Sequence, residues 1–181
     1  MSHLKSKTAL VTGSTSGIGL AMAIGLAKQG VNIMVNGFGE KDAAIAAIKA
    51  CGVEVEYHGA DMSKPIEIED LIKQTEKRFG SLDILVNNAG IQHTANVEDF
   101  PEDKWESIIA INLSSAFYTS HHALPGMKKR NWGRIINIAS VHGLVGSVQK
   151  SAYVAAKHGI VGLTKVTALE NAKTGITCNA I

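Results

Sequence analysis

The sequence has few cysteines, little net charge and no long hydrophobic run. The two cysteines, Cys51 and Cys178, stand far apart without the spacing of a metal site, so we expect free thiols. The formal net charge is only +2, which argues against a nucleic-acid-binding protein. The basic residues at 128–130 and 134 follow a helical pattern and are expected to complement a helix C-terminus instead.

A membrane or secretory protein is also not indicated. No segment approaches the roughly 18 consecutive apolar residues of a membrane-spanning helix. The start, "MSHLKSKTALVTG", enters a strand-like run at once and has no secretory hydrophobic region. We therefore expect a protein of the cytoplasm, with enough hydrophobic residues, 45%, to form a folded core.

Short apolar runs alternate with longer segments of helical periodicity along the chain. The expected strands are Thr8–Thr12, Asn32–Asn36, Val53–Tyr57, Asp83–Asn87, Arg134–Ala139 and Thr177–Ile181. The expected helices are Ile18–Gln29, Glu40–Cys51, Lys64–Phe79, Glu102–Arg130 and Ala152–Lys173. This alternation predicts an α/β fold, a doubly wound parallel sheet of the Rossmann type, in one domain over residues 1–181.

The last residues, "GITCNAI", lie inside an apolar strand that has only begun. A central strand without a following helix is unusual at the end of a domain. We therefore expect the fold to be incomplete at this end, so that further residues follow in the complete protein.

The first expected strand runs into a glycine-rich turn, "TGSTSGIG", and then a helix. Gly13, Gly17 and Gly19 allow a tight turn and a close approach of the backbone to a pyrophosphate, which the helix N-terminus attracts. Thr15 and Ser16 add hydroxyl donors. The pattern predicts a dinucleotide site, although an ordinary strand-to-helix turn remains the alternative.

The second expected strand ends in Asn36, Gly37 and Phe38. A basic residue here would favour NADP by binding its 2′-phosphate, and an acidic one would favour NAD by binding the ribose hydroxyl. Neither is present. Because no positive charge stands at these positions or beside Gly17, we expect NAD.

Tyr153 and Lys157 lie four residues apart within "SAYVAAK", and therefore on one face of an expected helix. A nearby ammonium favours the phenolate form, which could exchange a proton with a substrate near neutral pH. By themselves, these two residues could also be a chance pair.

Together these motifs resemble the short-chain dehydrogenase/reductase family. The resemblance rests on "TGSTSGIG" (12–19), Asp61, "NNAG" (87–90), Asn112, Ser140, and Tyr153 with Lys157, in the family's order along the chain. It implies that Asn112, Ser140, Tyr153 and Lys157 are catalytic. It also implies a set of cofactor-binding residues: Gly13, Thr15, Ser16, Gly17, Ile18, Gly19, Phe38, Asp61, Met62, Asn88, Ala89, Gly90, Tyr153 and Lys157.

Within the family, the similarity is greatest to members that oxidise D-3-hydroxybutyrate to acetoacetate with NAD. It is carried by "NGFG" (36–39), "NNAGIQHTA" (87–95), "GRIINIASVHGLV" (133–145) and "KSAYVAAKHGIVGLTKVTALE" (150–170). It implies that the substrate contacts Gln92, Ser140, His142, Lys150 and Tyr153. Gln92, His142 and Lys150 would hold its carboxylate, but each could instead have a structural or surface role.

Other functions remain open. A short-chain reductase could act on a 3-oxoacyl thioester or a polyol, and a naturally truncated chain could bind a dinucleotide without catalysis. The resemblance implies that the substrate lid and last strand of the family follow residue 181. It also implies that the complete protein forms a homotetramer, an expectation that the small residues near 155–162 support.

Overall fold

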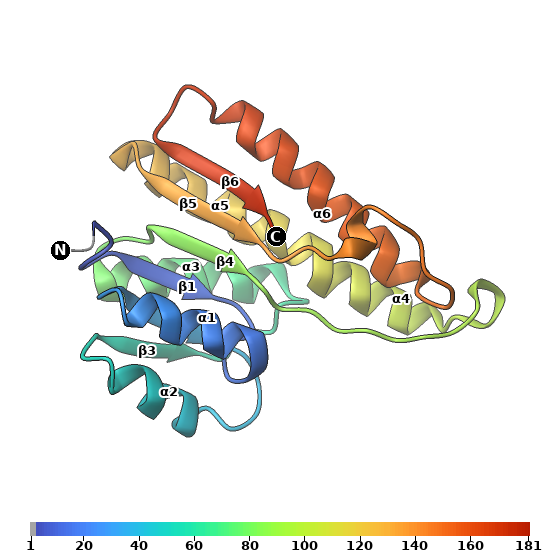
Figure 1. Ribbon diagram of the computed structural model, residues 1–181, viewed down its shortest axis with the longest axis horizontal. Coiled ribbons are helices and arrows are strands. Elements are labelled where there is room, and N and C mark those ends of the chain that lie inside the picture. Colours follow the sequence, from blue (N-terminus) through green and yellow to red (C-terminus); the bar gives the residue numbers. More distant parts are fainter. Residues whose placement is uncertain (1–2) are drawn as a thin grey trace.

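The protein is described by a computed structural model that covers residues 3–181 and contains one six-stranded sheet (Figure 1). The strands are β1 (Thr8–Val11), β2 (Asn32–Asn36), β3 (Val55–His58), β4 (Ile84–Asn87), β5 (Gly133–Asn137) and β6 (Ile176–Ala180). The helices are α1 (Gly17–Ala27), α2 (Asp42–Lys49), α3 (Pro65–Phe79), α4 (Glu102–Ile109), α5 (Ser115–Arg130) and α6 (Ser151–Glu170). Short 3₁₀ turns, η1 (Val97–Asp99) and η3 (Val141–Gly143), and a π-helical turn, η2 (Ala110–Ser114), complete the elements.

The sheet has the order β3-β2-β1-β4-β5-β6, and every neighbouring pair is parallel. The strands β1, β2 and β3 therefore follow one another towards one edge of the sheet, and β4, β5 and β6 follow one another towards the opposite edge. At this point of reversal, the loops that leave β1 and β4 diverge and open a crevice at the carboxyl ends of the strands. The predicted doubly wound parallel sheet is confirmed.

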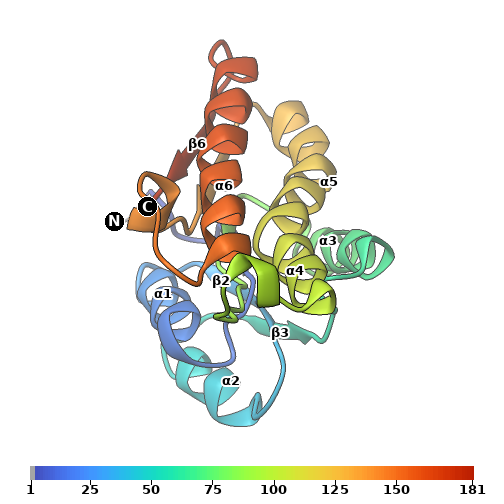
Figure 2. The same cartoon turned by 90° about the vertical axis from the view of Figure 1, so that its right-hand side faces the viewer.

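Two helical layers cover the sheet (Figure 2). Helices α1 and α2 pack on one face, where Ala23, Val35 and Ile48 are fully buried in one apolar cluster. Helices α3, α5 and α6 lie on the other face, where a second cluster includes the buried Leu71 and Met127. Since parallel strands are covered on both faces, their central residues are apolar in succession, as the continuous runs of the sequence predicted.

Most predicted boundaries lie within one or two residues of the observed ones. Pro65 occupies the first turn of α3, and Gly80, with φ +82°, ends this helix in the left-handed conformation. Asn131, with φ +50°, ends α5 in the same way. These residues fix the helix ends because their backbone conformations suit the first or last turn.

The segment predicted as one helix over 102–130 is divided by η2 into α4 and α5. A π-helical turn adds one residue to the helical repeat and therefore changes the direction of the side chains that it carries. Asn112 lies in this turn and is buried. The expected helical range of 102–130 is therefore observed, but with a π-helical turn at Asn112 that its periodicity did not indicate.

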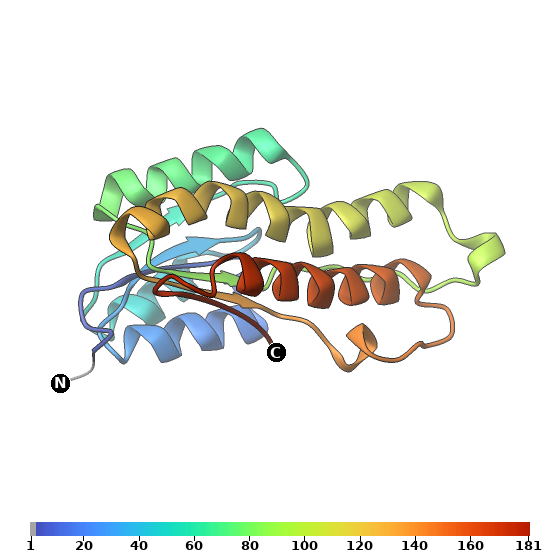
Figure 3. The ribbon, with the colours of Figure 1, turned by 90° about the horizontal axis from the view of Figure 1, so that it is seen from above.

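The loop after β4, helix α4 and the first turns of α6 project together beyond the carboxyl ends of the strands (Figure 3). A parallel bridge joins Ala95 to Lys150, and the Ala95 amide donates to the Gln149 carbonyl at 3.0 Å. This projection places the start of α6 beside the crevice. Within residues 3–181, no helix combines the length and the apolar character required to cross a membrane.

Candidate active site

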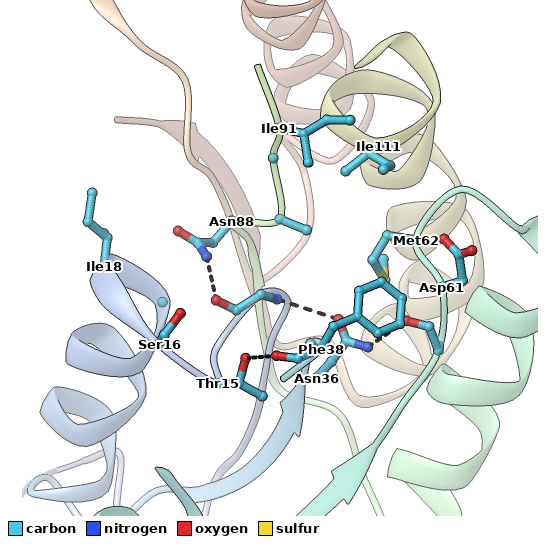
Figure 4. Close-up of a pocket in the computed structure, with 16 residues that line it drawn as sticks. Thr15, Ser16, Ile18, Asn36, Phe38, Asp61, Met62, Asn88, Ile91 and Ile111 are labelled. Atoms are coloured by element: carbon cyan, nitrogen blue, oxygen red, sulfur yellow. Dashed lines mark hydrogen bonds between the residues drawn. The ribbon is translucent and has the colours of Figure 1, made fainter. Parts of the chain in front are cut away.

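A pocket of about 380 Å³ lies in the crevice above β1, β2 and β4 (Figure 4). Its wall combines the glycine-rich turn, the end of β2, the loop after β3 and the loop after β4. The lining residues are Gly13, Thr15, Ser16, Ile18, Gly19, Asn36, Gly37, Phe38, Ala60, Asp61, Met62, Asn88, Ala89, Gly90, Ile91 and Ile111. The predicted cofactor residues therefore meet at one pocket, apart from Gly17, Tyr153 and Lys157, which are not among its lining.

The glycine-rich turn is held close to the loop after β4. Gly13 has φ +63°, and a Cβ atom on Gly19 would stand 2.2 Å from the Gly13 carbonyl oxygen. The side-chain amide of Asn88 donates to the carbonyls of Thr12 and Gly13 at 2.8 and 3.1 Å. Gly17, with φ +56°, shapes the backbone where α1 begins and does not itself line the pocket.

Helix α1 begins at this turn, so its first amide groups point towards the pocket. The first turn of a helix leaves N–H groups without partners inside the helix, and its dipole attracts negative charge. Ser16 is exposed, and its side chain forms no capping hydrogen bond. The turn thus offers backbone and hydroxyl donors to an anion, as a pyrophosphate requires.

Asn36 is a pocket residue whose role the sequence analysis missed. Its side chain is fully buried; its Nδ2 donates to the carbonyls of His58 and Ala60 at 3.1 and 2.9 Å. Its Oδ1 accepts from the Gly13 amide at 3.4 Å. Asn36 therefore joins the turn after β1 to the loop after β3, and its amide group is already occupied. A buried amide at the end of an apolar strand is the signal that could have indicated this role.

The chain turns sharply away after Asn36. Gly37 has φ +148°, and a Cβ atom there would stand 2.8 Å from Thr15 Oγ1. The Thr15 hydroxyl donates to the Phe38 carbonyl at 2.7 Å, while the Phe38 side chain is 66% exposed beside the pocket. The structure therefore gives the rim at 36–38 an aromatic face and no charge.

Asp61 supplies the negative charge of the pocket. The Ser63 amide and hydroxyl donate to its Oδ1 at 2.9 and 2.7 Å, and these hydrogen bonds, more than the nearby Lys64, hold the pKa of Asp61 below its ordinary value. The carboxylate is therefore ionised at neutral pH. It is suited to accept a hydrogen bond from an amino group of a ligand.

The loop after β4 is fixed at both ends. The Thr12 hydroxyl oxygen accepts from the amides of Asn88 and Ala89, both at 3.0 Å. Further along, the Asn112 side chain pairs with the backbone of Ile91: its Oδ1 accepts from the amide and its Nδ2 donates to the carbonyl, both at 2.9 Å. Asn112 thus acts as a clamp from η2 onto the loop, close to Gly90.

A second group of predicted residues meets around Tyr153, at the start of α6. Ser140 follows β5, and its Oγ accepts from the His142 amide at 3.2 Å. The His142 ring stands edge-on to the Tyr153 ring, with centroids 6.1 Å apart, and the Lys150 Nζ lies 3.4 Å from His142 Nε2. Four predicted residues, Ser140, His142, Lys150 and Tyr153, are therefore neighbours.

Lys157 lies one helical turn after Tyr153 and is buried. Its Nζ lies 5.5 Å from the centroid of the Tyr153 ring and donates to the Ile138 carbonyl at 2.5 Å. Burial lowers the pKa of this ammonium from its ordinary value, because desolvation disfavours the charged form. The amine thus lies on the same helical face as the phenol, and its hydrogen bond goes to the carbonyl after β5.

Gln92 is the predicted substrate residue that the structure does not join to the others by a direct contact. It is exposed on the loop after β4, which runs against the residues preceding α6. His142 Nδ1 is buried and has no hydrogen-bond partner among the described residues. The polar side chains beside Tyr153 therefore include one buried nitrogen atom, His142 Nδ1, that has no partner within this part of the chain.

The arrangement combines a dinucleotide-shaped pocket with a tyrosine, a serine and a lysine at the neighbouring strand end. The sequence model of the family described as short chain dehydrogenase matches residues 7–181. This chain belongs to the short-chain dehydrogenase family. Family membership explains why the motifs of residues 12–19, 87–90 and 140–157 converge, although they are far apart in the sequence.

Individual relatives in the family are similar over almost the whole chain. A D-beta-hydroxybutyrate dehydrogenase from Cupriavidus necator is 68% identical over 98% of this chain and 70% of its own length. Another from Rhizobium meliloti is 58% identical over 97% of this chain and 70% of its own length. The solved structure of an NAD⁺-bound xylitol dehydrogenase has a TM-score of 0.94 and 32% identity, covering 98% of this chain and 70% of that one.

Proposed function

We propose that this short-chain dehydrogenase catalyses the reversible, NAD-dependent oxidation of D-3-hydroxybutyrate to acetoacetate. The observation that supports it most is the grouping of two nitrogen-bearing side chains, His142 and Lys150, beside Ser140 and Tyr153. An alcohol at Tyr153 and a carboxylate at Lys150 describe a small hydroxy acid. The two similar D-beta-hydroxybutyrate dehydrogenases support the same substrate.

The residues of the pocket fit a dinucleotide. Because Gly13 and Gly19 have no side chains, a ligand can approach the backbone of the turn closely. The first backbone amides of α1 have no partner within the helix and can donate to a pyrophosphate. We assign Asp61, which lines the pocket and is ionised, to the amino group of the adenine. When bound, NAD would supply the hydride acceptor of the reaction.

NAD is preferred over NADP because of the rim at the end of β2. The amide of Asn36 is occupied by three backbone groups, and Phe38 places an aromatic ring beside the pocket. A 2′-phosphate there would meet neither a lysine nor an arginine among the lining residues. The hydroxyl of an unmodified ribose does not need such a charge. The NAD-bound state of the similar xylitol dehydrogenase supports this preference.

The proton of the substrate hydroxyl goes to Tyr153. Lys157 supports its phenolate form, because its buried ammonium, 5.5 Å from the centroid of the Tyr153 ring, favours a negative charge on that side chain. The Ser140 hydroxyl, at the end of β5, hydrogen-bonds the reacting oxygen as the carbon–oxygen bond becomes a carbonyl. Asn112 holds the loop that carries Ile91 and so supports the wall next to the reacting centre.

The substrate carboxylate is held by Lys150 and His142. The Lys150 ammonium and the His142 imidazole lie within hydrogen-bond distance, 3.4 Å apart, so both are close enough to contact the same carboxylate. Gln92 would add a third donor from the loop after β4. Selection of one enantiomer requires three fixed points at the reacting carbon: the hydroxyl at Tyr153, the chain that ends in the carboxylate at Lys150, and the hydrogen that would leave towards NAD.

A substrate panel tests this function. NADH formation is measured with D-3-hydroxybutyrate, L-3-hydroxybutyrate and xylitol, and NADH consumption is measured in the reverse direction with a 3-oxoacyl thioester. We expect the D-hydroxy acid to give the highest kcat/KM. A higher kcat/KM with the polyol or the thioester would show that the proposed substrate is wrong. NAD binding without turnover of any compound would show that the chain binds a dinucleotide but is not a dehydrogenase.

A further inference from the structure

Four buried polar side chains form a continuous row between α5 and α6, below the proposed active site. Asn87 and Asn137 are register partners at the carboxyl ends of β4 and β5, and both are buried. Thr119 on α5 and Thr164 on α6 flank them and are also buried. Since buried polar groups are costly unless paired, this row requires a reason other than core packing.

The hydrogen bonds of the row run in a single direction. The Thr119 hydroxyl donates to Asn87 Oδ1 at 2.7 Å, and Asn87 Nδ2 donates to Asn137 Oδ1 at 2.8 Å. Asn137 Nδ2 then donates to Thr164 Oγ1 at 2.8 Å, and the Thr164 hydroxyl donates to the Ile160 carbonyl at 2.7 Å. In both asparagines the amide oxygen accepts and the amide nitrogen donates. If either amide group were turned around, its donor and acceptor would no longer match their neighbours in the row.

The row meets α6 close to a second polar anchor. Asn137 bonds to Thr164, and the next residue of the chain, Ile138, accepts from Lys157 Nζ. Lys157 and Thr164 are seven residues apart, which is about two helical turns on one face of α6. These two hydrogen bonds, from Asn137 to Thr164 and from Lys157 to Ile138, therefore restrict both the translation of α6 along β5 and its rotation about its own axis.

The apolar packing of the first half of α6 rests largely on small side chains of the helix itself. Its buried Ala152 and Ala156 pack against Ile108, with Phe100, Ile109 and Leu113 partly buried beside them. Small side chains allow close approach but present few interlocking shapes. The polar contacts with the end of β5 therefore carry more of the positional specificity than they would in a larger core.

The row also connects the two halves of the site. Asn87 is followed directly by Asn88, Ala89 and Gly90, which line the dinucleotide pocket. Thr164 lies on the helix that carries Tyr153 and Lys157. A shift between the loop after β4 and α6 would therefore break the bond of Asn137 with either Asn87 or Thr164.

We propose that Asn137 and Thr164 are positioning residues that hold Tyr153 and Lys157 in place relative to Ser140 and to the dinucleotide pocket. This inference rests on the proposed function as far as turnover is concerned, since the position of Tyr153 matters through the proton that it takes. The placement itself is a property of the structure, and it can be measured without turnover.

Thr164→Val tests the proposal because valine keeps the shape of threonine and removes its hydroxyl. The Asn137 amide then loses its bond to α6 and keeps only the contact with Cys178 Sγ at 3.7 Å, so that α6 is held less firmly on the sheet. We expect kcat with D-3-hydroxybutyrate at saturating NAD to fall roughly 10- to 100-fold, as a displacement of about 1 Å can cause. The Kd for NAD, measured by calorimetry, stays unchanged. Thr164→Ser, which restores the hydroxyl, regains most of the parent's kcat.

Thr167→Val is the matched control. Thr167 lies one turn further along α6 and is buried to a similar degree, 5% exposed against 7% for Thr164. Its hydroxyl forms no hydrogen bond with the described residues, whereas its backbone carbonyl accepts one from the side chain of Asn171. This variant loses the same atom from the same helix and should keep the parent's kcat. An equal loss in both threonine variants would contradict the positioning role, as would a parent-like kcat in Thr164→Val.

A spectroscopic arm separates this inference from the proposed function. The chain has three tyrosines, so ring-labelled tyrosine gives few NMR signals, and Tyr153→Phe assigns the one at the site. We expect the Tyr153 signal to move in Thr164→Val, to return in Thr164→Ser and to stay in place in Thr167→Val. If the parent does not oxidise D-3-hydroxybutyrate, the proposed function fails and these signals still decide the positioning role. If Thr164→Val does not fold, Thr164→Ala gives the same comparison without a branched side chain.

Discussion

Removing the ammonium of Lys150 tests whether the site recognises a carboxylate. Lys150→Met keeps most of the length and apolar stem of the side chain and removes its charge. Lys150 precedes α6 and is half-buried, with its Nζ 3.4 Å from His142 Nε2. The change therefore leaves an imidazole at the site and deletes only the cation that we assign to the substrate carboxylate.

The expected magnitude follows from a charge-assisted hydrogen bond at a partly buried position. Such bonds contribute about 1.5–3 kcal/mol. Since about 1.4 kcal/mol corresponds to a tenfold change in binding, KM for D-3-hydroxybutyrate should rise roughly 10- to 150-fold. The Kd for NAD should not change, because Lys150 is not among the residues that line the dinucleotide pocket.

The assay compares two substrates. Initial rates of NADH formation are measured at saturating NAD with D-3-hydroxybutyrate and with its methyl ester, which lacks the charged carboxylate. The parent should prefer the acid, and Lys150→Met should lose this preference while its rate with the ester changes little. Lys165→Met, at an exposed position of α6, serves as the control for loss of a lysine.

Two results would refute the reasoning. An unchanged KM for the acid in Lys150→Met would remove Lys150 from the substrate site. An equal rise in KM for the acid and the ester would show that the lysine shapes the site without recognising the carboxylate.

Two further predictions concern the dinucleotide pocket and the buried lysine. Gly19→Ala should weaken NAD binding roughly 5- to 150-fold by calorimetry, because its Cβ would stand 2.2 Å from the Gly13 carbonyl oxygen and overpacking of this kind costs about 1–3 kcal/mol. Gly25→Ala, in the same helix with open space around it, should bind NAD normally and gain about 0.5–1 kcal/mol in stability; weakened binding in both variants would show a general effect of the helix. The pKa of Lys157 is lowered by burial, so between that lowered value and its ordinary value of 10.5 the unfolded chain binds more protons than the folded one. The free energy of unfolding of the parent, relative to that of Lys157→Met, should therefore rise with pH across this window, as thermal unfolding at several pH values measures. Parallel plots of stability against pH for the two proteins would contradict the burial of a charged amine.

Much of the fold could be predicted because its strands are continuous apolar runs. Residues such as Leu10, Val35 and Leu85 are buried by helices on both faces, so hydrophobicity alone indicates their strands. The position of β3 was less clear. Its outer residues, such as Glu56, are exposed at the sheet edge, and its observed span, Val55–His58, starts two residues after the predicted one.

The site residues could be predicted where their chemistry is unusual for their position. Three glycines in a turn, or a tyrosine and a lysine on one helical face, stand out in a sequence. Asn36 did not, because a neutral amide at a strand end carries no charge, and the backbone carbonyls of His58 and Ala60 come within its reach only in the folded sheet. Ile111 did not either, since an isoleucine in a helix indicates a core position unless a π-helical turn is known to redirect it.

Long-range hydrogen bonds were beyond prediction from residue types. The bond from Lys157 to the Ile138 carbonyl and the row from Thr119 to Thr164 depend on how α5 and α6 lie on the sheet. In the sequence, these threonines resemble any helical threonine that bonds to its own backbone. Only the register of β4 against β5 places Asn87 opposite Asn137 and makes the row possible.

The most direct test of the account is the oxidation of D-3-hydroxybutyrate by the parent chain and by Tyr153→Phe. We predict that the parent forms NADH and acetoacetate in equal amounts, and that Tyr153→Phe binds NAD with the parent's Kd but loses about 10²- to 10⁴-fold in kcat, the contribution of a positioned acid/base group. A variant that keeps kcat within about tenfold of the parent, far less than that contribution, would contradict the assignment of Tyr153 as the group that takes the proton.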